Sequence, residues 1–304
     1  MNVLVIGGQG YFGSEIVNYL LSKKYTLQAT TRSNQLPLAR DNIKWISYDL
    51  NDGLSQNLEL ALNWCEVVIY NASSIKPRKT NFGLGQSLEN EIYALYQLTS
   101  RSNFLASQHF IFISSGGSVY GELQNEILGN DESMTELPID SYGKFKLICE
   151  NVIKDNLISF KNFSILRISN IYSFCCDIDK SYGLITNLKN AALNETKFKL
   201  LGDGNNTRDY VNIFDVLRAI ESLIILGPQA CTINIGTGIE TSVFELISIF
   251  NERYSSKIKV EQENCEYTRI KRSKLNIQTA ATKLKWIPSI DLSSGINQYL
   301  SFKT

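Results

Sequence analysis

The sequence predicts an α/β protein with a doubly wound parallel sheet and a smaller, interleaved C-terminal part. Short apolar runs typical of buried strands alternate with amphipathic helical stripes up to about residue 172, and a glycine-rich turn joins the first run to the first stripe. Beyond residue 172 the alternation breaks down, but no linker or low-complexity segment divides the chain. We therefore expect residues 1–173 and 207–238 to form the sheet domain and residues 174–206 and 239–304 to form the second part.

The glycine-rich turn follows the first apolar run, at residues 3–6, and precedes a helical stripe that begins at Phe12. Glycines at this spacing allow a tight turn, a close approach of the backbone to a pyrophosphate and close packing of the helix on the strand. A purely structural turn is the alternative. The turn predicts a Rossmann-type dinucleotide site made of Gly7, Gly10, Tyr11, Phe12 and Gly13.

The second strand, expected at residues 26–31, ends in Thr30-Thr31-Arg32-Ser33 without an acid. A carboxylate at this point would accept a hydrogen bond from the ribose 2′-hydroxyl of NAD, whereas an arginine can bind the 2′-phosphate of NADP. Thr31 and Arg32 are therefore predicted cofactor-binding residues that favour NADP slightly over NAD. The alternatives are that Arg32 lies in solvent or stacks on the adenine of either cofactor.

Further strands are expected at residues 43–48, 67–70 and 110–114, and a helix with an apolar stripe is expected over residues 85–104. The third and fourth strands are followed by Asp49-Leu50 and Asn71-Ala72-Ser73, which include the small polar residues Asp49, Asn71 and Ser73. The carboxyl ends of parallel strands border the ligand crevice of a doubly wound sheet. We expect these five residues to contact the cofactor.

Tyr142 and Lys146 lie four residues apart at the start of an amphipathic run, so a helix would place both side chains on one face. This pair can form a proton-transfer unit. A phenol acts as a base near neutrality only if its ionised form is stabilised, and an adjacent ammonium provides that stabilisation. An ordinary exposed Tyr and Lys pair is the alternative reading of the spacing.

Composition restricts the classes of function. The chain has 304 residues, with thirty basic residues balanced by thirty acidic ones, which argues against nucleic acid or an anionic membrane as the main partner. No apolar run approaches 18 residues, and no signal peptide is recognisable, so we expect a cytoplasmic protein. The six cysteines show no C-x-x-C spacing and are expected to be reduced. A single histidine, His109, argues against zinc-protease motifs and a Ser-His-Asp triad, and no metal site is predicted.

Several short motifs occur in a fixed order and together resemble the extended short-chain dehydrogenase/reductase superfamily, in its nucleotide-sugar epimerase/dehydratase group. The resemblance spans nearly the whole chain. The motifs are the opening glycine turn, Asp49-Leu50, Ser114 to Gly121, Tyr142 with Lys146, Arg167 to Tyr172, Gly202-Asp203-Gly204, Arg208-Asp209-Tyr210-Val211, Asn234-Ile235-Gly236 and Leu284-Lys285-Trp286-Ile287-Pro288.

The resemblance implies that Tyr142 is the acid/base, that Lys146 assists it and holds the nicotinamide ribose, and that a hydroxyl at the end of the fifth strand completes a triad. Counted forward from the strand, the residue at that place is Ser115; counted back from Val119-Tyr120-Gly121, it is Gly116. We prefer Ser115, with Ser118 as a supporting hydroxyl. The resemblance further implies a nucleotide-diphosphate sugar as substrate and a homodimer. Its predicted substrate-binding residues are Ser115, Ser118, Asn170, Arg208 and, by a looser match, Arg269.

Three functions remain open at this point. Dehydratases of the group have Asp-Glu before the Val-Tyr-Gly motif, where this chain has Gly117-Ser118. The chain therefore lacks the carboxylates that a dehydratase would use to eliminate water. We expect epimerisation at carbon 4 of a nucleotide-activated hexose, with NADPH-dependent reduction of a 4-keto sugar as the alternative. A non-catalytic dinucleotide sensor or scaffold is the alternative from another class, although such a protein could dispense with Tyr142 and Lys146.

Overall fold

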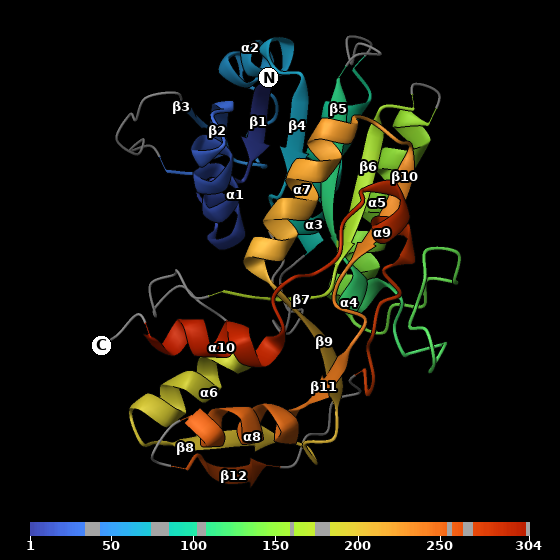
Figure 1. Cartoon of the computed structure of the whole chain (residues 1–304). Coiled ribbons are helices and arrows are strands. Elements are labelled where there is room, and N and C mark those ends of the chain that lie inside the picture. The colour runs from blue at the N-terminus through green and yellow to red at the C-terminus, as the bar shows by residue number, and fades with distance from the viewer. Residues whose placement is uncertain are drawn as a thin grey trace. The chain divides into compact units, whose positions relative to one another are not determined.

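The structure is a computed structural model of the whole chain (Figure 1). It describes residues 1–33, 43–73, 85–101, 108–158, 161–173, 183–253, 257–263 and 270–301. The chain divides into two compact units, each assembled from separate segments. The first, called the sheet unit, comprises Met1–Ser115, Asp140–Arg167 and Ala219–Ile233; the second unit comprises Gly116–Ile139, Ile168–Arg218 and Asn234–Thr304.

A seven-stranded sheet forms the centre of the sheet unit. In sheet order its strands are β10 (Cys231–Ile235), β6 (Phe163–Ile168), β5 (His109–Ser115), β4 (Val67–Tyr70), β1 (Asn2–Ile6), β2 (Thr26–Thr31) and β3 (Ile43–Ser47). The pairings of β1 with β2 and β4, of β2 with β3, and of β4 with β5 are parallel. The order 3-2-1-4-5-6 within this sheet is that of a doubly wound dinucleotide-binding fold, so the predicted fold class is confirmed.

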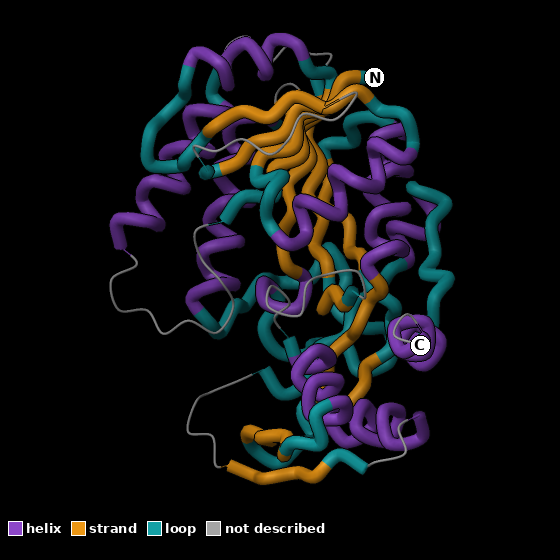
Figure 2. Tube along the Cα trace, turned by 90° about the vertical axis from the view of Figure 1, so that its left-hand side faces the viewer, coloured by secondary structure: helices purple, strands orange, loops and turns teal. Residues whose placement is uncertain are grey.

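Helices line both faces of this sheet (Figure 2). One core cluster joins strand side chains to α2 (Gln56–Trp64), α3 (Gly85–Thr99) and α5 (Ser141–Leu157). On α1 (Tyr11–Ser22), Tyr19 donates a hydrogen bond of 2.6 Å to Glu221 of α7 (Ile213–Leu226). The helix expected over residues 85–104 ends at Thr99, because Thr99 and Ser100 have low helix propensity.

The second unit contains two small sheets. One has the order β11 (Glu240–Ser242), β9 (Thr207–Asn212) and β7 (Asn170–Tyr172), and the other pairs β12 (Lys259–Glu263) with β8 (Lys197–Leu201). Its helices are α4 (Gly116–Val119), α6 (Leu184–Leu193), α8 (Val243–Arg253), α9 (Gln278–Lys283) and α10 (Leu292–Ser301). An apolar cluster that includes Phe198, Leu246, Phe250 and Ile296 forms a core within this unit.

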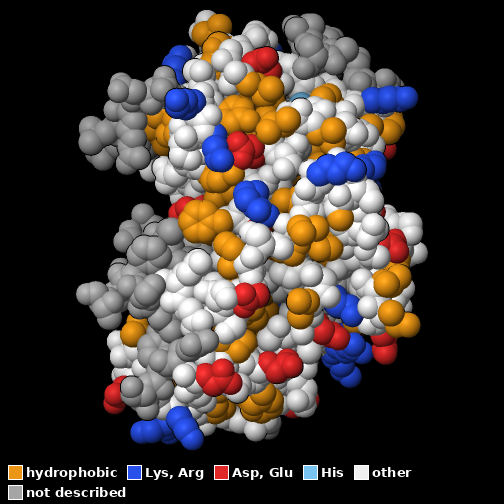
Figure 3. Space-filling view, viewed as in Figure 1, with side chains coloured by type: hydrophobic (Ala, Val, Ile, Leu, Met, Phe, Trp, Pro, Cys, Tyr) orange, Lys and Arg blue, Asp and Glu red, His pale blue; other side chains and the backbone are white. Residues whose placement is uncertain are grey.

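Charged side chains of both signs are interspersed on the face of the molecule drawn in Figure 3. This distribution fits a sequence without net charge. In the described part of the chain, no helix has the length and hydropathy that crossing a bilayer requires. The thiols of Cys65 and Cys149 are buried, and burial raises the pKa of each to about 12, which makes them poor nucleophiles.

Candidate active site

The glycine turn between β1 and α1 packs against the end of β4. Gly7 has a φ of 84°, and a Cβ at this position would lie 2.8 Å from the backbone nitrogen of Ala72. A Cβ at Gly13 would overlap the carbonyl oxygen of Gly7, whereas a Cβ at Gly10 would meet that oxygen only at 3.3 Å. The fold itself therefore needs glycine at positions 7 and 13, whereas a Cβ at Gly10 would require only a small adjustment of the turn.

The first turn of α1 offers backbone donors to an anion. Gly10 is the N-cap and supplies no side-chain hydrogen bond, and the first turn contains no acidic residue. Unpaired N–H groups at a helix N-terminus carry partial positive charge and bind phosphate groups. Tyr11 and Phe12, in the same turn, are half-buried. This set of donors fits the pyrophosphate of a dinucleotide.

The end of β2 has its hydroxyls engaged by the glycine turn. Thr30 accepts a hydrogen bond of 2.8 Å from the backbone N–H of Gly7. The Thr31 side chain is buried; its hydroxyl donates to Oε1 of Gln9 and accepts from the backbone N–H of Ser33 at 3.0 Å. Arg32 is exposed. Thr31 thus fixes Gln9, a residue whose role the sequence did not indicate.

The remaining predicted cofactor-binding residues lie at the ends of β3 and β4. Asp49 and Leu50 lie just after β3, separated from it only by Tyr48. Asp49 accepts a hydrogen bond of 2.9 Å from the Asn51 N–H. Asn71, Ala72 and Ser73 follow β4 and are half-buried. Because β1, β2, β3 and β4 are parallel neighbours, their carboxyl ends form one edge of the sheet.

The predicted catalytic pair lies at the start of α5. Asp140 caps this helix by accepting a hydrogen bond of 2.7 Å from the Gly143 N–H. Lys146 is 4% exposed, and its Nζ lies 5.9 Å from the centre of the Tyr142 ring. The same Nζ donates a hydrogen bond of 3.1 Å to the carbonyl of Ile113 in β5, the strand that ends at Ser115. The structure therefore positions the lysine ammonium against both the tyrosine ring and the strand that carries Ser115.

Residues further along α5 and the adjoining strands form a buried polar cluster that the sequence did not predict. Glu150 of α5 accepts hydrogen bonds from Ser114 of β5 and from Arg167 of β6, and all three side chains are buried. Arg167 and Glu150 are 17 positions apart, so no local sequence pattern indicates their pairing.

The predicted substrate-binding residues that the structure describes all lie in the second unit, apart from Ser115. Ser118 is in α4, Asn170 begins β7, and a Cβ on Gly117 would lie 2.9 Å from Oδ1 of Asn170. The α4 turn and the start of β7 are therefore close neighbours within this unit. Arg269 lies outside the described residues.

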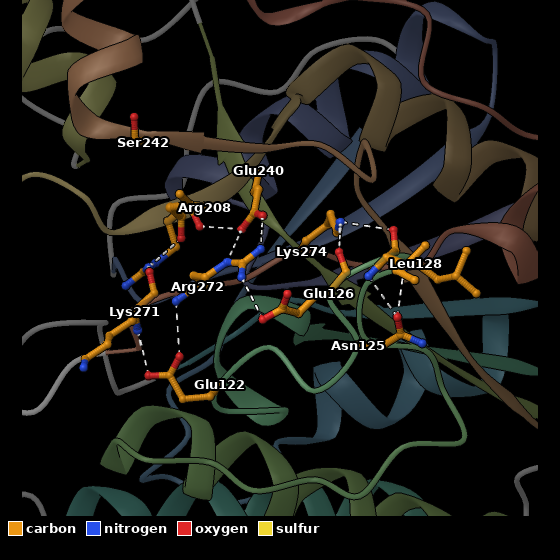
Figure 4. A network of polar contacts seen from close by, with 12 residues as sticks. Glu122, Asn125, Glu126, Leu128, Arg208, Glu240, Ser242, Lys271, Arg272 and Lys274 are labelled. Atoms are coloured by element: carbon orange, nitrogen blue, oxygen red, sulfur yellow. Dashed lines mark hydrogen bonds and ion pairs between the residues drawn. The ribbon is translucent and has the colours of Figure 1, made fainter.

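Arg208, on β9, lies beside a network of charged side chains (Figure 4). Its guanidinium donates a hydrogen bond of 2.7 Å to the Thr207 carbonyl. Next to it, Arg272 pairs with Glu240 at 2.5 Å and with Glu126 at 3.2 Å. Hydrogen bonding from Arg272 lowers the pKa of Glu240. Among the described residues, Arg272 is thus paired with two carboxylates.

Asp209, the chain neighbour of Arg208, is buried and holds the turn after β10. Its carboxylate accepts hydrogen bonds from the Thr237 N–H at 2.8 Å, the Thr237 hydroxyl at 2.7 Å and the Gly238 N–H at 3.1 Å. Burial raises the pKa of Asp209, and these hydrogen bonds oppose that rise. These hydrogen bonds attach β9 to the turn at Thr237 and Gly238, directly beside Arg208.

Comparison with known proteins identifies the family. A model of the NAD dependent epimerase/dehydratase family matches residues 3–236. A relative in Methanocaldococcus jannaschii, described as a putative UDP-glucose 4-epimerase, is 31% identical over 99% of this chain and 97% of its own length. A dTDP-4-dehydro-6-deoxyglucose reductase of Escherichia coli is 24% identical over 98% of this chain and 96% of its own length.

Solved structures share the fold. The UDP-glucuronic acid 4-epimerase of Bacillus cereus, in complex with UDP-glucuronic acid and NAD, superposes with a TM-score of 0.86 at 22% identity over 100% of both chains. The UDP-glucose 4-epimerase of Thermotoga maritima, with UDP-glucose, gives a TM-score of 0.85 at 24% identity over 99% of this chain and 98% of that chain. With the family match, these likenesses confirm the resemblance to extended short-chain dehydrogenases/reductases. The protein is an NAD(P)-dependent enzyme that belongs to the NAD dependent epimerase/dehydratase family.

Proposed function

We propose that the protein is a nucleotide-sugar epimerase that inverts carbon 4 of a nucleotide-activated hexose, with Ser115, Tyr142 and Lys146 as its catalytic residues. The observation that carries this proposal is the position of Lys146, whose buried Nζ lies 5.9 Å from the Tyr142 ring centre and is bonded to the strand that ends at Ser115. This arrangement puts a proton-carrying cation beside the tyrosine that would act as the acid/base, and it ties both to the strand that ends at Ser115.

The glycine turn, the N-terminus of α1 and the ends of β2, β3 and β4 would hold the dinucleotide. A dinucleotide held there would supply reversible hydride transfer at its nicotinamide, the chemistry that inversion of carbon 4 through a ketone needs. Lys146 would have two roles: it would assist Tyr142 and also bind the nicotinamide ribose. The uncapped first turn of α1, with its backbone donors, supports this assignment of the pyrophosphate site.

The catalytic residues would move one proton in each half of the reaction. Tyr142 accepts the proton of the 4-hydroxyl as that carbon is oxidised to a ketone, and returns it when the ketone is reduced from the other side. Ser115 donates a hydrogen bond to the same oxygen and holds it in line. Ser118, Asn170, Arg208 and Arg269 would bind the substrate, with the arginines on its diphosphate.

The relatives support UDP-sugars as the first substrates to test. The Methanocaldococcus jannaschii protein is named a putative UDP-glucose 4-epimerase, and a relative from Mycolicibacterium smegmatis is named a UDP-glucose 4-epimerase. We therefore expect the protein to interconvert UDP-glucose and UDP-galactose or a pair of related UDP-hexoses. We also expect a homodimer, which sedimentation analysis of the purified protein would test.

Reduction of a nucleotide-4-keto sugar with exchangeable NADPH is the second candidate. The end of β2 favours it, because Thr31 is a buried hydroxyl and Arg32 is an exposed cation, so no carboxylate at these two positions opposes a 2′-phosphate. The Escherichia coli relative named as a dTDP-4-dehydro-6-deoxyglucose reductase supports the same reaction class. The dinucleotide released on denaturing the purified protein distinguishes the candidates: retained NAD supports the epimerase, and an empty site that binds NADPH supports the reductase.

The replacement Tyr142→Phe tests the assigned base, since it removes only the hydroxyl. We expect turnover of the UDP-hexose to fall by about 10²- to 10⁴-fold while dinucleotide affinity changes little. Tyr93→Phe is the matched control, because Tyr93 is 60% exposed on α3. Activity of Tyr142→Phe within about threefold of wild type would refute the assignment.

A further inference from the structure

We infer that Glu150 and Arg167 are positioning residues that fix the catalytic helix α5 against β5 and thereby set the geometry between Tyr142, Lys146 and Ser115. The inference rests on the proposed function, because it concerns the alignment of the same catalytic residues. Neither side chain is assigned to substrate or cofactor.

The pair is fully buried and multiply bonded. Nε of Arg167 donates to Oε1 of Glu150 at 3.1 Å and to Oε2 at 3.2 Å, and its Nη2 donates to Oε2 at 2.6 Å. Both residues are 0% exposed. The guanidinium of Arg167 therefore grips the carboxylate through a planar fork, a geometry that restricts rotation of both side chains.

The same carboxylate reaches the strand that carries Ser115. Ser114, which is 4% exposed, donates a hydrogen bond of 2.6 Å to Oε1 of Glu150. One helical turn earlier on α5, Lys146 donates to the carbonyl of Ile113 on the same strand. Helix α5 is thus tied to the end of β5 at two points spaced four residues apart, and a shift of the helix along the strand would break both ties.

The chemistry of the pair argues for a role in geometry. Removing two charges from water is so costly that replacement of a buried ion pair by well-packed apolar residues is often neutral or stabilising. An ion pair therefore adds little stability that apolar residues could not provide. It does add directional bonds, because one carboxylate accepts from the planar guanidinium and from the serine hydroxyl, while Lys154 lies 3.6 Å from the same group on its solvent side. Catalysis is sensitive to such alignment: a misplacement of about 1 Å can cost on the order of 10²-fold in rate.

Two serine variants separate positioning from simple loss of stability. Ser114→Ala removes the tie between Glu150 and β5. Ser164→Ala is the matched control, because Ser164 is a 0% exposed serine on the adjacent strand β6. Within the described part of the chain, its hydroxyl shares one hydrogen bond of 2.9 Å with His109, at the opposite end of β5. Both variants lose one buried hydroxyl contact and should show similar falls in Tm. We expect kcat to fall about tenfold in Ser114→Ala, with KM within about twofold of wild type, and to stay within about twofold in Ser164→Ala.

A double variant removes the whole pair without leaving a buried charge. Glu150→Leu with Arg167→Met keeps an apolar core of similar volume, so the protein should remain folded, with a circular dichroism spectrum and cooperative melting like those of wild type. We expect its kcat to be at least tenfold lower than wild type at a nearly unchanged KM and dinucleotide Kd. A folded double variant with kcat within threefold of wild type would overturn the inference.

Hydrogen exchange supplies a readout that does not depend on turnover. In the folded double variant, we expect faster amide exchange in the first turns of α5 and at the end of β5 than in wild type, and unchanged exchange around Ser164. If wild type turns over no nucleotide sugar, the proposed function fails, and exchange alone decides the positioning: faster exchange in these two segments supports it, and unchanged exchange overturns it. If wild type is active and the double variant matches it, only the positioning fails.

Discussion

The single histidine makes a sharp pH prediction, because burial holds it neutral. His109 begins β5, is 2% exposed and shares a hydrogen bond of 2.9 Å with Ser164 through Nε2. Its Nδ1 is buried and has no hydrogen-bond partner among the described residues. A proton added there would place a charge in apolar surroundings, and burial accordingly lowers the pKa of His109 to about 4.

The sign and size of the effect follow from linkage. An unfolded chain binds a proton to histidine at a pKa of about 6.5, whereas the folded protein resists protonation until about pH 4. Between these values the unfolded state holds more protons, so stability is complete above pH 6.5 and falls as the pH is lowered towards 4. The two pKa values give a loss of about 2 kcal/mol between pH 7 and pH 5, and about 3 kcal/mol over the whole window.

Two measurements test this. Because the untagged chain has one histidine, its imidazole gives one set of NMR signals, and their pH titration reports the folded pKa directly. The unfolding free energies of wild type and His109→Gln, measured in urea at pH 7 and pH 5, should differ in slope, with wild type losing about 2 kcal/mol more than the variant. A folded-state pKa of 6 or above, or equal losses in both proteins, would refute the reasoning.

Three further predictions concern the dinucleotide and the substrate. Gly13→Ala should lower the free energy of unfolding in urea by about 1 to 3 kcal/mol, because its Cβ would overlap a carbonyl of the turn. Gly10→Ala should leave that free energy within about 0.5 kcal/mol and weaken only dinucleotide binding. Equal stability of the two variants would contradict the packing argument. NADP(H) should bind at least as tightly as NAD(H), and Thr31→Asp with Arg32→Ala should reverse the order; calorimetric titration giving a tenfold wild-type preference for NAD would reject this. Arg208→Ala should weaken UDP binding by about tenfold or more without changing dinucleotide affinity, and unchanged UDP affinity would make the arginine a structural residue.

The parts of the fold that the sequence predicted are those with a strong local signal. The strand at residues 67–70 was predicted with the bounds that β4 has, because four consecutive β-branched or aromatic residues fill a strand buried on both faces. The helix with Tyr142 and Lys146 follows from 3.6-residue periodicity, and Asp140 supplies a side-chain cap at its start. The glycine turn could be located because its spacing is imposed by backbone contacts.

The parts that escaped prediction depend on contacts between distant segments. The Glu150 and Arg167 pair joins a helix to a strand, and the partners of Arg272 come from residues 126 and 240. Periodicity within one segment does not indicate such pairings, because the local sequence around a charged residue is similar whether or not that residue has a distant partner. The burial of His109 was not predicted for a different reason: β5 begins at His109, one residue before the apolar run from which the strand was predicted.

The position of β10 at the edge of the large sheet has a consequence for biosynthesis. β6 ends at Ile168 but its outer neighbour β10 begins only at Cys231, so a nascent chain exposes the free edge of β6 while the intervening segment is translated. At about 5–20 residues per second this takes on the order of 3 to 12 s. All six residues of β6 are buried in the finished protein, and the unpaired backbone N–H and C=O groups along its exposed edge can pair with other chains. A truncated product that stops between these strands should therefore aggregate or bind chaperones. The seven-stranded sheet can be completed only after the chain has been translated through β10.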